Sequence, residues 1–152
     1  MCKVKNMNKQ ELKIKTFDDL TTHELYEIVR ARCDIFLLEQ GIVCEDFDRI
    51  DYNSLHCFIY EGGEVKAYLR AFLKDGEIKV GRVLSRVHKM GLGRRLLKEA
   101  LPRILSHFGK NEIHVDAQSH AVGFYERMGF VVTSEEFLEE GIPHKAMLYT
   151  KG

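Results

Sequence analysis

The chain has 152 residues, enough for one domain that buries its own hydrophobic core. Lys and Arg together number 23, as do Asp and Glu, so the formal net charge is zero and the basic excess typical of a nucleic-acid-binding protein is missing. No apolar run approaches the roughly 20 residues that span a bilayer, and the polar N-terminal sequence lacks the apolar segment of a signal peptide. The four cysteines form no C-x-x-C pair, which is typical of reduced thiols. We therefore expect a cytoplasmic protein with no nucleic-acid or membrane partner.

The chain is expected to begin with a polar lead-in and a strand. Residues 1–10 are polar and are expected to form a flexible lead-in, followed by a single domain over residues 11–152. Residues 12–17 alternate apolar with polar side chains, which predicts the first strand.

A long helix is expected next. Thr21 or Thr22 can act as its N-cap, and Glu24 would place an acid in its first turn. Apolar residues continue at helical spacing to about Gln40. We expect one break in this helix, near residues 32–34.

Residues 41–54 read as a loop that carries alternating acids, namely Asp46, Asp48 and Asp51. The glycine and the closing glutamate of an EF-hand are missing, so a calcium loop is not expected. The motif H-x-D-x-x-x-H over residues 114–120 runs from a predicted strand into a loop and supplies too few ligands for a metal site. The sequence therefore predicts no metal.

Three strands joined by tight turns are expected in the middle of the chain, at residues 55–60, 64–73 and 77–84. Gly62-Gly63 and Asp75-Gly76 mark the two turns. Consecutive strands with such short connections favour an antiparallel meander.

The C-terminal half alternates helices with strands. An apolar stripe from Leu96 to Phe108, interrupted by Pro102, predicts an amphipathic helix. A strand at 112–117 would then follow strand 77–84 by a right-handed parallel crossover. The remaining elements are a helix at 120–128 and strands at 130–132 and 145–149. The expected fold class is α/β (α+β): one mixed sheet of about seven strands with about four helices packed on it.

The sequence GRVLSRVHKMGLGRRLL, residues 81–97, places Gly91 and Gly93 at the start of the amphipathic helix, among basic residues. The first N–H groups of a helix have no partner within it and carry partial positive charge, so this turn is suited to bind a phosphate. Taken alone, the pattern fits an ordinary strand-to-helix turn equally well. The endings of a P-loop and of a dinucleotide-binding fingerprint are both absent.

A second motif, F-Y-x-x-x-G-F over residues 124–130, is by itself typical of core aromatic residues around a glycine C-cap. Together with Gly91-x-Gly93, and in this order along nearly the whole chain, it resembles the GNAT family of acetyl-CoA-dependent N-acetyltransferases. The sequence also resembles the ElaA-like subgroup in six further places: RCDIFLLEQ at 32–40, D-x-D-x-x-D at 46–51, His56, GRV at 81–83, AQ at 117–118 and GIPH at 141–144.

The resemblance implies a single-domain GNAT-like fold and roles for individual residues. The backbone of Val83, Leu84 and Ser85 would pair with the pantetheine arm of acetyl-CoA, and Gln118 would also contact this co-substrate. The pyrophosphate would be held by the amides of His88, Lys89, Met90, Gly91, Leu92, Gly93 and Arg94. Tyr125 would protonate the leaving thiolate. The chain departs from the family pattern at His88 and Lys89, which stand where the family has Arg or Gln and a glycine.

We therefore expect transfer of an acetyl group from acetyl-CoA to a primary amine by direct attack, without a metal. Glu39 and His144 are the leading candidates for the general base. Further candidates are Asp46, Asp48, His56 and His114. The acceptor would be a small-molecule or peptide amine, attracted by Glu45 and by the loop acids Asp46, Asp48 and Asp51 if it is cationic. A catalytically silent acyl-CoA-binding or sensing module is the alternative, and a homodimer stays open.

Overall fold

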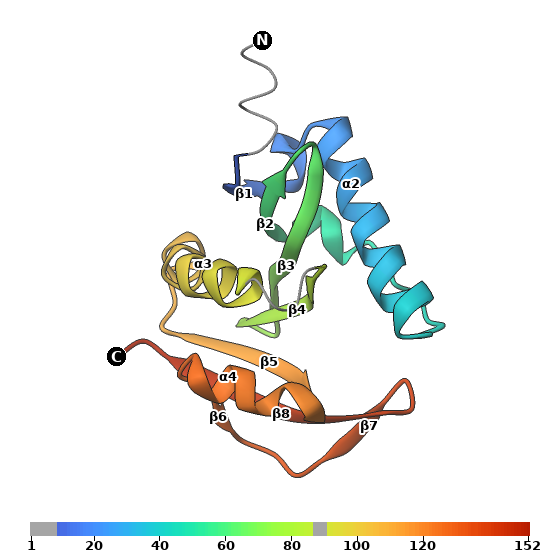
Figure 1. Ribbon diagram of the computed structural model, residues 1–152. Helices are drawn as coiled ribbons and strands as arrows, with labels where there is room; N and C mark the ends of the chain where they lie inside the picture. The colour runs from blue at the N-terminus through green and yellow to red at the C-terminus, as the bar shows by residue number, and fades with distance from the viewer. Residues whose placement is uncertain (1–8, 87–90) are drawn as a thin grey trace.

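The structure is a computed structural model that describes residues 9–86 and 91–152 (Figure 1). Most of the expected lead-in over residues 1–10 lies outside the described residues, as do the predicted site residues His88, Lys89 and Met90. Of the lead-in, Gln10 is described and is hydrogen-bonded: its amide oxygen accepts from Arg95, and its amide nitrogen donates to Glu61.

Within the described residues, one mixed sheet of eight strands forms the centre of the fold, in the order β1-β2-β3-β4-β5-β8-β6, with β7 paired to β8. The strands are β1 (Glu11–Thr16), β2 (Leu55–Glu61), β3 (Glu64–Lys74), β4 (Glu77–Ser85), β5 (Glu112–Gln118), β6 (Val131–Val132), β7 (Phe137–Glu139) and β8 (Ile142–Thr150). The antiparallel meander of β2, β3 and β4 is confirmed, as is the parallel pairing of β4 with β5. The fold class predicted from the sequence is therefore confirmed.

The α-helices that the structure describes in residues 9–86 and 91–152 pack on this sheet: α2 (Thr22–Arg32), α3 (Leu92–Phe108) and α4 (Val122–Arg127). Short 3-10 turns, η1 (Phe17–Asp19), η3 (Ile50–Asn53) and η4 (Ser119–Ala121), connect them to the strands. Thr21 is the N-cap of α2: its hydroxyl accepts from the Glu24 amide, and the Glu24 carboxylate accepts from the Thr21 amide. The predicted break is confirmed at Cys33, where α2 continues as the π-helix η2 (Cys33–Glu39).

Helices cover the sheet on both faces, so the central strands are buried on both sides (Figure 1). On one face, α3 packs its apolar stripe against side chains such as Cys57 and Leu69. On the other face, Ile28 and Ala31 of α2 pack against Phe58 and Tyr68. Consecutive strand residues therefore bury against different helices, which explains why β2 and β3 are apolar almost throughout.

Two irregularities in β4 separate the halves of the sheet. The pairing of β4 with β5 covers only three residues of each strand and ends at Val80 and Val115. Beyond this point β4 pairs with β3 alone, and that pairing shifts register between Tyr68 and Arg70. The open side of β4 is where the functional candidates gather.

Candidate active site

A cleft of about 1020 Å³ lies where β4 and β5 separate. Its walls come from the end of β4, the ends of β5 and β8, the start of α3, α4 and the end of η2. The predicted site residues that line it are Val83, Leu84, Ser85, Gly91, Gly93, Arg94, Gln118, Tyr125 and His144. Leu92 instead points its side chain into the core. Glu39 is exposed and does not line the cleft, although its neighbour Gln40 does.

A β-bulge shapes the β4 wall of the cleft. Gly81 is opposite Arg70 and Leu84 is opposite Tyr68, so Arg82 and Val83 together face the single β3 residue between them. Arg82 has a φ of 52°, in the left-handed region that residues with a side chain seldom adopt. Such a bulge bends the strand and redirects its backbone groups. Here it turns β4 away from β5 at the cleft.

The start of α3 presents partial positive charge to the same cleft. Gly91 is the N-cap with a φ of 66°, a conformation that glycine adopts without strain, and as a glycine it has no side chain with which to cap the helix. The first amide bonded back to Gly91 is that of Arg95, at 3.0 Å, so the amides of residues 92–94 precede the helical ladder. Gly93 leaves its backbone open beside Ser85 and Phe124, since even an added Cβ would meet them at no less than 3.8 Å.

Tyr125 lies on α4, opposite the β4 wall, and is only 5% exposed. The rings of Phe124 and Phe130 meet its ring edge-on, with centroids 5.2 and 5.4 Å away. Burial raises the pKa of the Tyr125 hydroxyl above its ordinary value, so the side chain is a protonated phenol at neutral pH. No hydrogen bond joins this hydroxyl to another residue in the described part of the chain, and Tyr125 lines the cleft.

His144 comes from β8 and pairs in register with Gln118 of β5. Its Nδ1 lies 2.7 Å from the Ile142 carbonyl oxygen, which can only accept, so Nδ1 carries the proton and the lone pair is on Nε2. The Glu139 carboxylate lies 3.6 Å from Nε2, and the Phe137 ring stacks on the imidazole. This arrangement leaves Nε2 able to accept a proton.

Three polar side chains that line the cleft are joined by hydrogen bonds. The Gln118 amide donates to Gln40 Oε1 at 3.1 Å, and His120 Nε2 donates to Gln118 Oε1 at 2.7 Å. These hydrogen bonds join the end of η2 to the end of β5, two segments far apart in the sequence.

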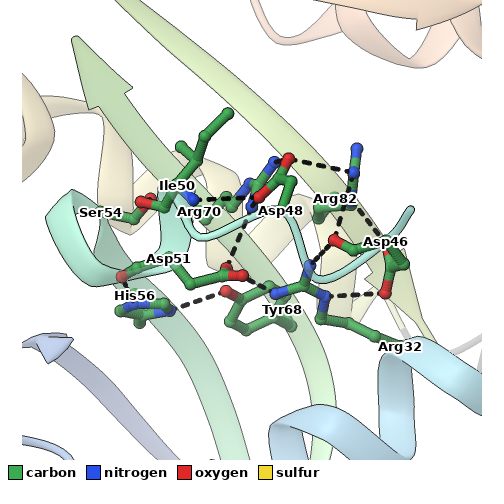
Figure 2. A network of polar contacts seen from close by, with 10 residues as sticks. All are labelled: Arg32, Asp46, Asp48, Ile50, Asp51, Ser54, His56, Tyr68, Arg70 and Arg82. Atoms are coloured by element: carbon green, nitrogen blue, oxygen red, sulfur yellow. Dashed lines mark hydrogen bonds and ion pairs between the residues drawn. The ribbon is translucent and has the colours of Figure 1, made fainter.

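The acidic loop forms a compact ionic network with three arginines rather than an open acidic surface (Figure 2). Its pairs join Asp46, Asp48 and Asp51 to Arg32 of α2, Arg70 of β3 and Arg82 of β4. Three positive and three negative charges cancel, so the expectation that these acids attract a cationic acceptor is corrected. Burial alone would raise the pKa of Asp48, but hydrogen bonds and charge from Arg70 lower it to about 2, which makes this carboxylate a poor base.

His56 belongs to the same network and is buried in its neutral form (Figure 2). Its Nε2 donates to the Asp51 carbonyl oxygen at 2.9 Å, and its Nδ1 accepts from the Tyr68 hydroxyl at 2.7 Å. Burial lowers the pKa of His56, and the charges of Arg32 and Arg70 add to that effect. Its lone pair faces Tyr68 rather than the cleft, which removes it from the candidates for the base.

The sequence reading missed the three arginines of this network. Arg70 stands in the buried run YLRAFL of β3, and a charged side chain in such a run requires an acidic partner. That signal indicates that a partner exists, but it does not say which of the chain's acids it is.

In the ranges 9–86 and 91–152, no group of three or more His, Cys, Asp or Glu side chains is arranged to hold a metal ion. In that same portion of the chain, no helix has the length and apolar character needed to cross a membrane.

Known proteins resemble this chain in sequence and in fold. A family model described as an acetyltransferase (GNAT) domain matches residues 44–151. ElaA of Escherichia coli (strain K12) is 29% identical over 136 residues, covering 85% of this chain and 89% of ElaA. The crystal structure of an acyl-CoA N-acyltransferase from Pseudomonas aeruginosa, 31% identical, has a TM-score of 0.85 and covers 92% of this chain and 99% of that one. The crystal structure of E. coli ElaA, 26% identical, has a TM-score of 0.86 and covers 93% and 99%. The ElaA-like resemblance is thus confirmed. The chain belongs to the GNAT family of acetyltransferases, which implies acyl transfer from an acyl-CoA.

Proposed function

We propose that the protein transfers an acetyl group from acetyl-CoA to the primary amine of a small molecule or a peptide. The amine attacks the thioester directly, and Tyr125 protonates the leaving thiolate. The observation that carries this proposal is the convergence of the open edge of β4, the start of α3 and the Tyr125 side chain on one cleft.

The co-substrate side of the cleft fits an acyl-CoA. The edge of β4 from Val83 to Ser85 has no pairing with β5, so its backbone can bond an amide-containing arm instead. The amides of residues 92–94 and the side chain of Arg94 suit the pyrophosphate, because a helix N-terminus favours negative charge. His88, Lys89 and Met90 are proposed to belong to this site on the family resemblance alone.

Tyr125 suits the role of general acid. A thiolate that departs from the thioester needs a proton, and a phenol kept protonated by burial can supply it. The neighbouring aromatic rings fix the direction of the hydroxyl, so that little reorganisation accompanies the proton transfer.

His144 is the favoured general base. An ammonium acceptor must lose a proton before it attacks, and Nε2 of His144 has a free lone pair at the edge of the cleft. Glu39 remains a second candidate only through a water or a movement of η2, because its side chain does not line the cleft. Glu45, Glu139 and Glu140 are the exposed acids on the acceptor side, and they favour a cationic acceptor.

Two measurements test the function. Titration calorimetry with coenzyme A should detect binding, and a thiol-release assay with acetyl-CoA should show turnover with at least one amine from a panel of polyamines, aminoglycosides, amino acids and peptides. Folded protein that binds no coenzyme A by calorimetry or thermal shift would contradict the proposal. Binding without thiol release by any amine would favour the silent acyl-CoA-binding module.

Tyr125→Phe tests the acid. Removing the hydroxyl should lower kcat by about 100-fold, the size of a typical general-acid contribution, and leave coenzyme A affinity nearly unchanged. Tyr149→Phe is the matched control: its ring also packs on Phe130, with centroids 5.4 Å apart, but it does not line the cleft. Unchanged turnover in Tyr125→Phe would remove Tyr125 from the mechanism.

A further inference from the structure

We propose that Arg82 is a positioning residue: its side chain, held by Asp46 and Asp48, fixes the β4 bulge and so the backbone N–H groups that border the cleft. This role in catalysis rests on the function proposed above. The bulge geometry itself is a property of the unliganded chain and can be measured separately.

The residue type at the bulge calls for an explanation. Glycine adopts a positive φ with little strain, and the chain has a glycine next door at position 81, yet the left-handed residue is Arg82. The other non-glycine residues with positive φ in the described ranges are Arg49, Asp75 and Glu140, and none of them lies inside a strand. Arginine occupies a position where glycine would have less backbone strain, which indicates that the arginine side chain contributes to the structure there.

The side chain of Arg82 is anchored at three points. Its Nε lies 2.6 Å from Asp46 Oδ1, and its Nη2 lies 3.4 Å from Asp48 Oδ2 and 3.3 Å from the Asp46 carbonyl oxygen. Figure 2 shows Arg70 and Arg82 reaching Asp48 from different strands.

The anchor itself is rigid. Arg70 of β3 binds both carboxylate oxygens of Asp48 at 2.8 Å. Arg32 of α2 donates to the Asp46 carbonyl oxygen at 2.6 Å and to its carboxylate at 3.2 Å. Both guanidinium groups are almost fully buried, so they hold the loop acids in one arrangement. The bulge is therefore tied through Asp46 and Asp48 to α2 and β3.

The contacts of Arg82 with Asp46 and Asp48 act on the end of β4, the side of the cleft where we propose that the acyl group lies. Pairing with β5 has already ended at Val80, and Arg82 and Val83 share one opposing residue on β3. If the bulge relaxed into regular pairing, the strand would slip by one residue and Val83 to Ser85 would exchange faces. The anchored Arg82 side chain opposes that slip and so keeps the amides of Val83 and Leu84 in place.

Amide exchange and NMR spectra of the unliganded chain test the geometry. Arg82→Ala should shift the ¹⁵N–¹H signals of Val83 and Leu84 and raise their hydrogen-exchange rates by about tenfold or more. Arg82→Lys should restore part of the protection, since it keeps the charge. The control Arg86→Ala loses an ion pair of 2.9 Å with Asp34 outside the cleft and should leave both amides unchanged.

Activity then tests the positioning role. With acetyl-CoA and an amine that the wild type accepts, Arg82→Ala should lower kcat by about 10- to 100-fold and change the KM for acetyl-CoA far less, as expected for a misplaced reacting group. Asp46→Asn, which keeps the size of the side chain, should move both readouts in the same direction if Arg82→Ala does not fold. Wild-type exchange at Val83 and Leu84 in both variants would overturn the proposal whatever the activity. A wild type that binds no coenzyme A would refute the proposed function while leaving the exchange result to decide the bulge.

Discussion

Asp51 is the residue on which the stability of the ionic network depends most directly. Its carboxylate accepts from Arg32 at 2.6 Å and from Arg70 at 3.1 Å, and these two side chains are 2% and 3% exposed. Asp51→Asn keeps the shape but removes the charge, which leaves the network one positive charge in excess. Breaking a buried ion pair costs about 3–5 kcal/mol. In this variant Arg32 still pairs with Asp46, and Arg70 still pairs with Asp48. We therefore expect a loss of stability at the lower end of this range, about 3 kcal/mol.

Urea unfolding followed by circular dichroism measures this loss. For a domain of this size, about 3 kcal/mol corresponds to a fall in Tm of roughly 6–12 °C. Glu64→Gln is the control, because its pair with Lys66 has the similar length of 2.9 Å but lies at the surface with side chains 26% and 44% exposed, and surface pairs contribute about 0–1 kcal/mol. A loss below about 1 kcal/mol in Asp51→Asn, or an equal loss in the control, would refute the claim that burial sets the strength of this network.

The pH dependence of unfolding gives two further predictions. The pKa of His56 is lower in the fold than the ordinary 6.5, so the unfolded chain binds the proton more readily and stability should fall as the pH drops from about 7.5 to 5.5; His56→Gln should abolish this slope. Burial would raise the pKa of Glu24, but Lys13, the Thr21 amide and Lys15 outweigh it and lower the value to about 2. Together with Asp48, also at about 2, Glu24 stabilises the fold above its unfolded pKa, and this contribution should be lost as the pH falls from about 4.5 to 2. Glu24→Gln should flatten the acid limb of the stability curve, and an unchanged limb would contradict the role of Glu24.

Local sequence patterns were enough for most of the fold. The N-cap at Thr21 or Thr22, the tight turns of the meander and the apolar stripe of α3 each involve residues that are close in the chain, and each was confirmed, with Thr21 as the cap. The strand β7 was missed because its two apolar residues stand among the acids of EEFLEE, which show neither an alternation nor an apolar run. Its pairing with β8 is instead favoured by the turn at Glu140 and Gly141, both with positive φ.

In the candidate site, too, the residues of short local motifs could be predicted, whereas contacts between distant parts of the sequence could not. Gly91, Gly93 and Tyr125 belong to short motifs whose local geometry fixes their position, and the structure brings all three to one cleft. The loop acids could not be interpreted in this way, because their partners lie 14 to 36 positions away in the sequence. An aspartate that attracts a substrate and one that holds a buried arginine look alike in a sequence, and only the paired cation distinguishes them. In this chain the cations are Arg32, Arg70 and Arg82. The loop acids that were predicted to attract the acceptor therefore bind these arginines and support β4, the strand on which we propose that the acyl group lies.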